Sequence, residues 1–316
     1  AITGSLSGNN NADYNFYIVA TDAENQTSER QFTLGVADLP TGGTIDTSVS
    51  GYRIHKFTSV GNNTFTVYET ISCDILMVAG GGSGGTSLGE HKVGAGGAGG
   101  LIFKPSFSVT AQTYNIVIGD GATRVDGSDP VYYSPANKSQ GNRGDNTTAF
   151  SLTAYGGGGG AATNGGGNSN ASGGSGGGGH YDEAGGTATQ ASSTSGGYGN
   201  DGGSKSNLPE SDFGYGGGGA GAAGYNDVPE ASTARHGRWA GGEGMYQATI
   251  DNTVYNFATM FGTGSGEIIS GEAWFAGGGG AGEADNGDLT YGFGGEGGGG
   301  KGAYLATGTG GAWSST

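Results

Sequence analysis

The amino-acid sequence predicts an all-β protein in which a β-sandwich carries an attached bundle of polyglycine II helices, with essentially no α-helix. Three observations predict this fold class. Glycine occupies 76 of the 316 positions and is concentrated in blocks. Hydrophobic residues supply only 33% of the chain, and the larger ones gather in short β-prone runs between those blocks. No segment shows the 3.6-residue apolar spacing of an amphipathic helix over a sufficient length.

The first 39 residues contain two β-prone runs, residues 14–20 and 31–36, which we expect to pair as a hairpin. Two strands alone are marginally stable in water. The pattern resembles the C-terminal, closing hairpin of an immunoglobulin-like or cadherin-like module. We therefore expect residues 1–39 to belong to a cut-off domain or to complete the sheet of a neighbour. Residues 40–47, which include Gly42 and Gly43, are expected to be a linker.

Residues 48–155 are predicted to form the β-sandwich. Two strands are expected around the turn sequence Gly61-Asn62-Asn63. A strand is expected at residues 73–79, which are apolar apart from Asp74 and lead directly into Gly80. Further strands are expected at residues 101–103, 107–109, 114–118 and 150–154.

Residues 156–316 are predicted to form the polyglycine II bundle, with inserted loops and a hairpin near 246–257. Collagen is excluded because the glycines do not recur at every third position and only 6 prolines are present. Glycine is also disfavoured inside strands. Extended helices with three residues per turn can instead pack at backbone distance, with hydrogen bonds between neighbouring helices. The tracts concerned are 156–160, 173–179, 214–221, 277–280 and 294–300, joined by the shorter tracts 80–85 and 94–100.

The order of strands and glycine blocks from about residue 50 to residue 300 resembles the glycine-rich domain of phage tail-fibre and other virion fibre proteins. The segments that carry the resemblance are 74–82, 94–102, 113–121, 152–160 and 274–280. The resemblance implies a β-sandwich with polyglycine II helices beside it, and other fibre subunits as partners in a homo-oligomer. The family often ends with an apolar strand after its last glycine tract, and residues 312–316 contain none.

Composition argues against several classes of function. The formal net charge is −16, so the chain lacks the basic footprint that nucleic acid requires. Cys73 is the only cysteine and forms neither an internal disulfide nor a cysteine-based metal site. No apolar run approaches the roughly 20 residues of a membrane span, so no membrane insertion is expected. No metal is expected either, because the histidines do not occur at metal-ligand spacing; they are His55, His91, His180 and His236.

Motifs that elsewhere indicate catalysis are explained here by the glycine content. The Gly-x-Ser-x-Gly pattern occurs around Ser83 and Ser175, but neither copy lies between a strand and a helix. Lys301 is followed by Gly302, so there is no Walker-type phosphate loop. We therefore expect no enzymatic activity and no cofactor.

Calcium binding has two weak indications. Residues 196–201 match the opening of a calcium-binding β-roll repeat, but the pattern does not recur at nine residues. Asp120, Asp126 and Asp129 could supply oxygen ligands, and the competing interpretation is that they form turns.

The aromatic residues allow two interpretations. The chain has 16 Tyr, 12 Phe and 3 Trp, and many of them lie between the glycine tracts. Large rings could cap the bundle and exclude water, because glycine supplies no side-chain volume. Alternatively, some rings could lie in exposed loops and bind a host-surface glycan or protein. The candidate contact residues are the basic-aromatic cluster Arg235, His236, Arg238 and Trp239, together with Tyr181, Tyr198 and Tyr225.

The expected function is a structural and adhesive module of a virion fibre, most simply a phage tail fibre, exposed on the virion surface. The alternative is a cellular extracellular adhesin or matrix protein with the same fold. In a eukaryotic secretory route its Asn-x-Ser/Thr sites would carry glycans; these are Asn25, Asn62, Asn137, Asn146 and Asn170. Ice binding is disfavoured because the tracts are irregular in length and interrupted by bulky loops.

Overall fold

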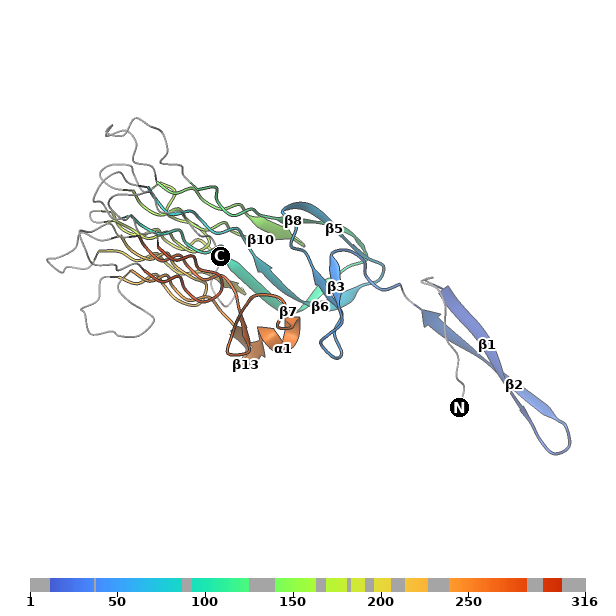
Figure 1. Ribbon diagram of the computed structural model, residues 1–316. Coiled ribbons are helices and arrows are strands. Elements are labelled where there is room, and N and C mark those ends of the chain that lie inside the picture. The colour runs from blue at the N-terminus through green and yellow to red at the C-terminus, as the bar shows by residue number, and fades with distance from the viewer. Residues whose placement is uncertain are drawn as a thin grey trace.

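A computed structural model describes residues 12–36, 38–86, 93–124, 140–162, 169–180, 183–190, 196–205, 214–226, 239–282 and 292–302. Over these ranges the chain is an all-β protein, as predicted (Figure 1). The single helix in the described ranges, α1 (Phe257–Phe261), has five residues and is capped by the Asn256 side chain, which accepts the N–H of Thr259. No helix in this part of the chain has the length and apolar character needed to cross a membrane.

The predicted N-terminal hairpin is present. Strands β1 (Ala12–Thr21) and β2 (Thr27–Val36) pair over ten residues without a register shift. The Asp22 carboxylate fixes the turn by accepting the N–H groups of Glu24 at 3.0 Å and Gln26 at 2.8 Å. Neither strand pairs with any other described strand.

Residues 41–46, expected within a linker, are bound to the following domain. Thr41 exchanges two backbone hydrogen bonds with Thr66, at 3.0 and 2.9 Å. Strand β3 (Thr44–Asp46) pairs with β4 (Ile54–Lys56). Gly42 and Gly43 lie between these contacts with φ of 121° and 63°, and a β-carbon on Gly42 would collide with the backbone of Thr64. The glycines that suggested a linker therefore serve a close approach of two backbones.

The sandwich consists of two sheets. One has the strand order β10 (Leu152–Ala154), β9 (Thr147–Ala149), β8 (Gln112–Ile118) and β5 (Gly61–Val67). The other has the order β11 (Gly197–Tyr198), β7 (Leu101–Val109) and β6 (Ile71–Val78). The buried core between them comprises Phe65, Val67, Ile75, Met77, Ala79, Ile102, Val109, Ile116, Ala149 and Ala154.

The runs 101–103 and 107–109, expected as separate strands, are parts of the single strand β7. The pairing of β7 with β6 shifts register between Cys73 and Ile75. At this irregularity Ser106 has φ of 52°, and its N–H donates to the Asp74 carboxylate at 2.8 Å. A β-bulge lets the strand continue through the change of register.

A second apolar layer forms against Leu101 and Phe103, two fully buried residues of β7. It contains the predicted hairpin, β12 (Gln247–Ile250) with β13 (Thr253–Asn256), together with α1. The Phe103 ring lies 5.3 Å from the rings of both Tyr255 and Phe257, measured between centroids. A further hairpin, β14 (Glu267–Ile269) with β15 (Glu272–Trp274), follows α1.

The strands of the sandwich continue directly into the glycine tracts (Figure 1). Backbone hydrogen bonds in the tracts recur every third residue, which is the repeat of a polyglycine II helix. The N–H groups of Gly94, Gly97 and Gly100 donate to the carbonyl oxygens of Ala161, Gly158 and Tyr155, at 3.0, 2.8 and 2.8 Å. The bundle prediction is thus confirmed for the described tracts.

Successive residues of one tract bond to different neighbouring tracts. Whereas Gly97 donates to Gly158, the next residue, Ala98, donates to Gly218 at 2.9 Å. Tract 94–100 accordingly runs antiparallel to 155–161 and parallel to 215–218. Sandwich and bundle are interleaved along the chain: tracts 80–85 and 94–100 belong to the bundle, and β11 belongs to the sandwich.

Candidate functional site

The topology places one set of tract ends at the end of the bundle that is remote from the sandwich. Tracts that follow β6, β8, β10, β11 and β15 lead away from the sandwich, and tracts that precede β7, β9 and β12 lead back to it. Outgoing and returning tracts are antiparallel neighbours, for example 222–226 and 239–245. Seven segments outside the described residues join such tract ends: 87–92, 125–139, 163–168, 181–182, 206–213, 227–238 and 283–291.

Four of the candidate contact residues belong to two of these segments. Arg235, His236 and Arg238 are in segment 227–238, and Tyr181 is in segment 181–182, so all four lie outside the described residues. The described residues that flank these two segments form backbone hydrogen bonds. Tyr225 donates its N–H to the carbonyl oxygen of Ala240 at 3.1 Å, and His180 and Glu183 are paired through their backbones.

Trp239 is a packing residue. Its side chain is only 8% exposed, and its carbonyl oxygen accepts the N–H of Ala281 at 2.9 Å. Its φ of 72° places the residue in the left-handed region directly after segment 227–238. Trp239 therefore fits the interpretation that large rings exclude water from the bundle, and so does the fully buried Tyr215.

Tyr198 and Tyr225 have different surroundings. Tyr198, in β11, packs against the second apolar layer, and burial raises the pKa of its hydroxyl. Tyr225 is half-buried beside segment 227–238, and the pKa of its hydroxyl is raised first by burial and then by the charge of Glu243. Of the three described candidates, Tyr225 is the one that adjoins the connecting segments with part of its side chain accessible.

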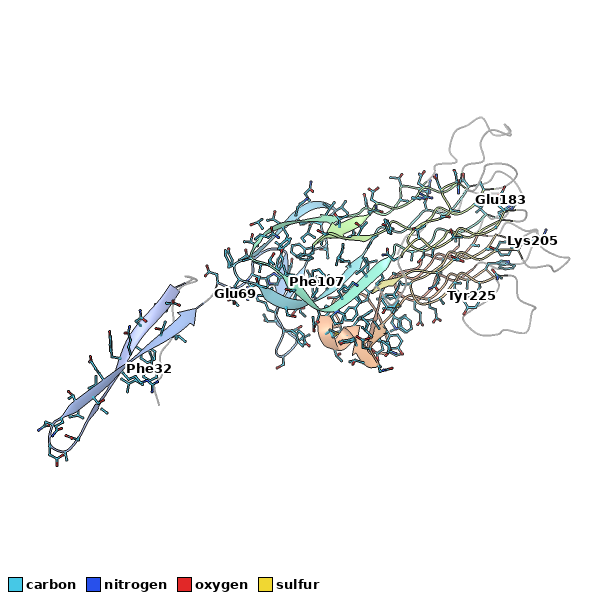
Figure 2. The ribbon with its side chains drawn as sticks, turned by 180° about the vertical axis from the view of Figure 1, so that it is seen from behind. Phe32, Glu69, Phe107, Glu183, Lys205 and Tyr225 are labelled. Carbon is cyan, nitrogen blue, oxygen red and sulfur yellow. The ribbon has the colours of Figure 1, made fainter. Side chains whose placement is uncertain are left out.

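The remote end also carries residues that the sequence did not single out. Figure 2 shows Glu183 and Lys205 at the same end of the bundle as Tyr225. Lys205 is brought near Tyr225 because the N–H of Ser204 donates to the Asn226 side chain at 2.7 Å. Phe293 follows segment 283–291 closely in the sequence, and the Nζ of Lys301 lies 5.6 Å from the centroid of its ring. No short sequence motif marks these pairs, because Lys205 and Tyr225 belong to different tracts, and Phe293 and Lys301 lie at opposite ends of tract 294–300.

Asp126 and Asp129, considered for calcium, lie outside the described residues, and the described candidates serve as structural groups. The carbonyl oxygen of Asp120 accepts the N–H of Asp145, and the Asp201 carboxylate accepts the N–H of Ala188 at 2.7 Å. The Asn200 side chain donates to the carbonyl oxygens of Gly219 and Ala220. No group of three or more His, Cys, Asp or Glu side chains able to hold a metal occurs among the described residues.

The two serines of the Gly-x-Ser-x-Gly pattern lie within the bundle. Ser175 is fully buried, and its N–H and C=O bond to Ala98 and Gly158 of neighbouring tracts. The Ser83 hydroxyl accepts the N–H of Asn142 at 2.9 Å. Neither serine lies in a strand-to-helix turn, which is where the nucleophile of a hydrolase with this motif lies.

These features define a class: a glycine-rich, all-β protein whose sandwich strands continue as a polyglycine II bundle. The chain belongs to the glycine-rich domain family, whose model matches residues 58–315. The match covers the sandwich and the bundle and begins after the β1–β2 hairpin. Comparisons with curated proteins and with solved structures find no match.

Proposed function

We propose that this chain is a structural and adhesive module of a virion fibre, such as a phage tail fibre, that presents its connecting segments to the surface of a host cell. The observation that carries the proposal is that the described tract ends flanking seven further segments gather at one end of a scaffold made of mutually bonded tracts. Backbone contacts between tracts restrict which side chains fit at tract positions, whereas these contacts place no such restriction on the residues of the connecting segments. Segments of this kind on a rigid scaffold are common binding elements.

Segment 227–238 is the proposed main contact with the host. It contains Arg235, His236 and Arg238, which form a local basic cluster in a chain of net charge −16. Arginine pairs with carboxylate or phosphate groups and stacks on planar groups. Trp239 and Tyr225 anchor the two ends of the segment, and Tyr181 belongs to another such segment, between the described residues His180 and Glu183. The proposed target is a host-surface glycan or protein, bound without chemical reaction and without a cofactor.

The test is attachment of the module to host cells after the double substitution Arg235→Ala and Arg238→Ala. Both residues lie between bonded tracts, so the melting temperature should stay unchanged while attachment falls by at least tenfold. Arg53→Ala is the matched control, because Arg53 is an exposed arginine in the β3–β4 connection of the sandwich. Attachment of the double variant at the level of the parent would contradict the proposal.

A cellular extracellular adhesin is the second candidate. It is favoured by the exposure of Asn25, at the tip of the β1–β2 hairpin, and of Asn62, in β5. Both are in Asn-x-Ser/Thr sites that a eukaryotic secretory route can glycosylate. The intact mass of the chain from its native source distinguishes the candidates, since glycan mass at these sites supports the adhesin and an unmodified mass supports the virion fibre.

A further inference from the structure

Two aromatic residues belong to the tracts on either side of tract 239–245. The N–H of Tyr225 donates to the carbonyl oxygen of Ala240 at 3.1 Å, and the N–H of Gly241 donates to the carbonyl oxygen of Phe293 at 2.8 Å. Both bonds are made by the peptide group between Ala240 and Gly241, and the C=O and N–H of a trans peptide point in opposite directions. The tracts of Tyr225 and Phe293 therefore lie on opposite sides of tract 239–245.

Lys205 extends this arrangement beyond Tyr225. The N–H of Ser204 donates to the Asn226 side chain at 2.7 Å, so the end of tract 199–205 lies next to the tract of Tyr225. Figure 2 shows Lys205 and Tyr225 at the same end of the bundle. Lys205 is exposed and Tyr225 is half-buried, so an ammonium group accompanies a partly accessible ring.

Lys301 extends the arrangement in the other direction, beyond Phe293. The chain reverses at residues 296–298, and the N–H of Gly302 then donates to the carbonyl oxygen of Gly292 at 2.9 Å. This return places the Nζ of Lys301 at 5.6 Å from the centroid of the Phe293 ring. Lys301 is exposed, and Phe293 is 42% exposed. The second ring is thus also accessible and is also accompanied by an ammonium group.

These four side chains form what we call the aromatic row, in the spatial order Lys205, Tyr225, Phe293 and Lys301. The row crosses five neighbouring tracts, which are residues 199–205, 222–226, 239–245, 292–295 and 299–302. Tracts bonded through their backbones lie about 4.8 Å apart, as strands do, so the four intervals span at most about 20 Å. A surface of this length suits an extended polymer, because a single small molecule would contact only part of it.

The charges around the aromatic row favour an uncharged polymer. The net charge of −16 repels polyanions from the chain as a whole. At the row itself the two lysines oppose a cationic partner, and so do Arg235 and Arg238, which belong to the segment between two of its tracts. Glu243 adds a carboxylate near Tyr225, where its charge helps to raise the pKa of the hydroxyl. Charged side chains of both signs suit hydroxyl groups, because a hydroxyl both donates and accepts.

The two rings suit the remaining surface of a sugar. A pyranose ring presents C–H groups on its faces and hydroxyl groups around its edge. The face of an aromatic ring carries partial negative charge and attracts C–H groups. An uncharged polysaccharide therefore matches both components of the row, with its C–H faces on the rings and its hydroxyl groups on the ammonium groups.

We infer that the aromatic row binds an extended, uncharged polysaccharide. Sugar rings stack on Tyr225 and Phe293, and their hydroxyl groups accept hydrogen bonds from Lys205 and Lys301. The inference rests on the proposed attachment function for its biological setting, and it names the class of host-surface target. Binding makes and breaks no covalent bond.

The first test is isothermal titration calorimetry of the full 316-residue chain with linear oligosaccharides. The uncharged probes are maltohexaose, cellohexaose and mannohexaose, and the anionic probe is hexagalacturonate. At least one uncharged probe should bind with a dissociation constant below about 1 mM. Binding of none of the uncharged probes, or tighter binding of hexagalacturonate, would overturn the inference.

Variants of the row identify the surface that binds. Phe293→Ala should raise the dissociation constant at least about fivefold, because it removes a stacking surface. Phe293→Tyr keeps the ring and should stay within about twofold of the parent, which distinguishes loss of stacking from damage to the fold. Tyr52→Ala, which removes an exposed ring of the sandwich, is the matched control and should also stay within about twofold. Equal effects of Phe293→Ala and Tyr52→Ala would contradict the assignment of the row.

Treatment of host cells separates this inference from the proposed function. Periodate oxidises the vicinal diols of surface sugars, and protease removes surface proteins. Attachment of the chain should be lost after periodate and retained after protease. The reverse result would make the target a protein, which contradicts the polysaccharide but leaves attachment as the function. Lack of attachment to any untreated host cell would instead contradict the proposed function, while oligosaccharide binding by the isolated chain would still support the row.

Discussion

Gly82 and Gly158 approach so closely that a β-carbon on Gly82 would collide with the carbonyl oxygen of Gly158. The preceding residue behaves differently, because the nearest atom to a β-carbon on Gly81 would be the carbonyl oxygen of Gly97, at 3.7 Å. Neighbouring positions of one tract thus face different surroundings, as the threefold repeat of the helix requires.

We predict that Gly82→Ala lowers the free energy of unfolding by about 1–3 kcal/mol, the usual cost of forcing an extra group into a packed interior. Gly81→Ala should be neutral, or stabilising by up to about 1 kcal/mol through the unfolded chain. Chemical denaturation of the two variants measures the difference. Equal stabilities would show that the tract 80–85 is not held against its neighbours.

Gly217→Val should be severely destabilising. A β-carbon on Gly217 would collide with the carbonyl oxygen of Gly96, and valine adds two further methyl groups at the same contact. The loss should exceed about 3 kcal/mol, since backbone cannot move aside as a flexible side chain can. Gly300→Val is the control, because no atom lies within 4 Å of the position of a β-carbon there. An unchanged melting temperature for Gly217→Val would refute the packing of tract 214–221.

Cys73 should react slowly with alkylating reagents. Burial, and to a smaller extent the charge of Asp74, raises the pKa of the Cys73 thiol to about 11. The reactive species is the thiolate, so at pH 8 the rate with iodoacetamide should be about a hundredfold below that of an unhindered cysteine with a pKa near 8.5. The rate should approach the ordinary value in denaturant, which serves as the internal control. Similar rates in the folded and unfolded chain would contradict the placement of Cys73.

The β3–β4 hairpin should weaken at acid pH through Asp46. The Nζ of Lys56 donates to the Asp46 carboxylate at 2.7 Å, and the N–H of Ser48 donates at 2.8 Å. These bonds, that of Lys56 first, hold the pKa of Asp46 well below its ordinary value. A lowered pKa in the folded state stabilises the protein above the unfolded pKa of about 3.9, and the contribution is lost as the pH falls below that value.

Asp46→Asn should therefore reduce stability slightly at pH 7, and its difference from the parent should shrink progressively as the pH falls below about 4, when measured as the midpoint of thermal unfolding. The effect is small because the pair is close to solvent. Glu69→Gln, which removes an exposed carboxyl without such hydrogen bonds from Lys56 and Ser48, is the control for the loss of one negative charge. If Asp46→Asn lowered the unfolding midpoint by the same amount at every pH, the effect would come from packing and not from charge.

Much of the bundle could be predicted from sequence because glycine leaves few alternatives. A tract such as 156–160 makes neither a stable α-helix nor a good interior strand, so its backbone groups must bond to other tracts. The hairpin at 247–256 could also be predicted from sequence. Its turn residues Asp251 and Asn252 readily adopt the left-handed backbone conformation that the turn requires. Segment 227–238 was recognised as a candidate contact by its basic residues together with the adjoining Trp239.

The sequence by itself thus determined the all-β class, most of the longer strand runs and the presence of a polyglycine II bundle, because these follow from backbone preferences within a few residues. Only the tertiary structure decided which tracts are neighbours, for example that Gly97 bonds to Gly158 while Ala98 bonds to Gly218. It also decided that Trp239 is buried and that residues 41–46 are attached to the sandwich. These outcomes depend on contacts between residues far apart in the chain, and identical glycine tracts carry no side chains that would specify their partners.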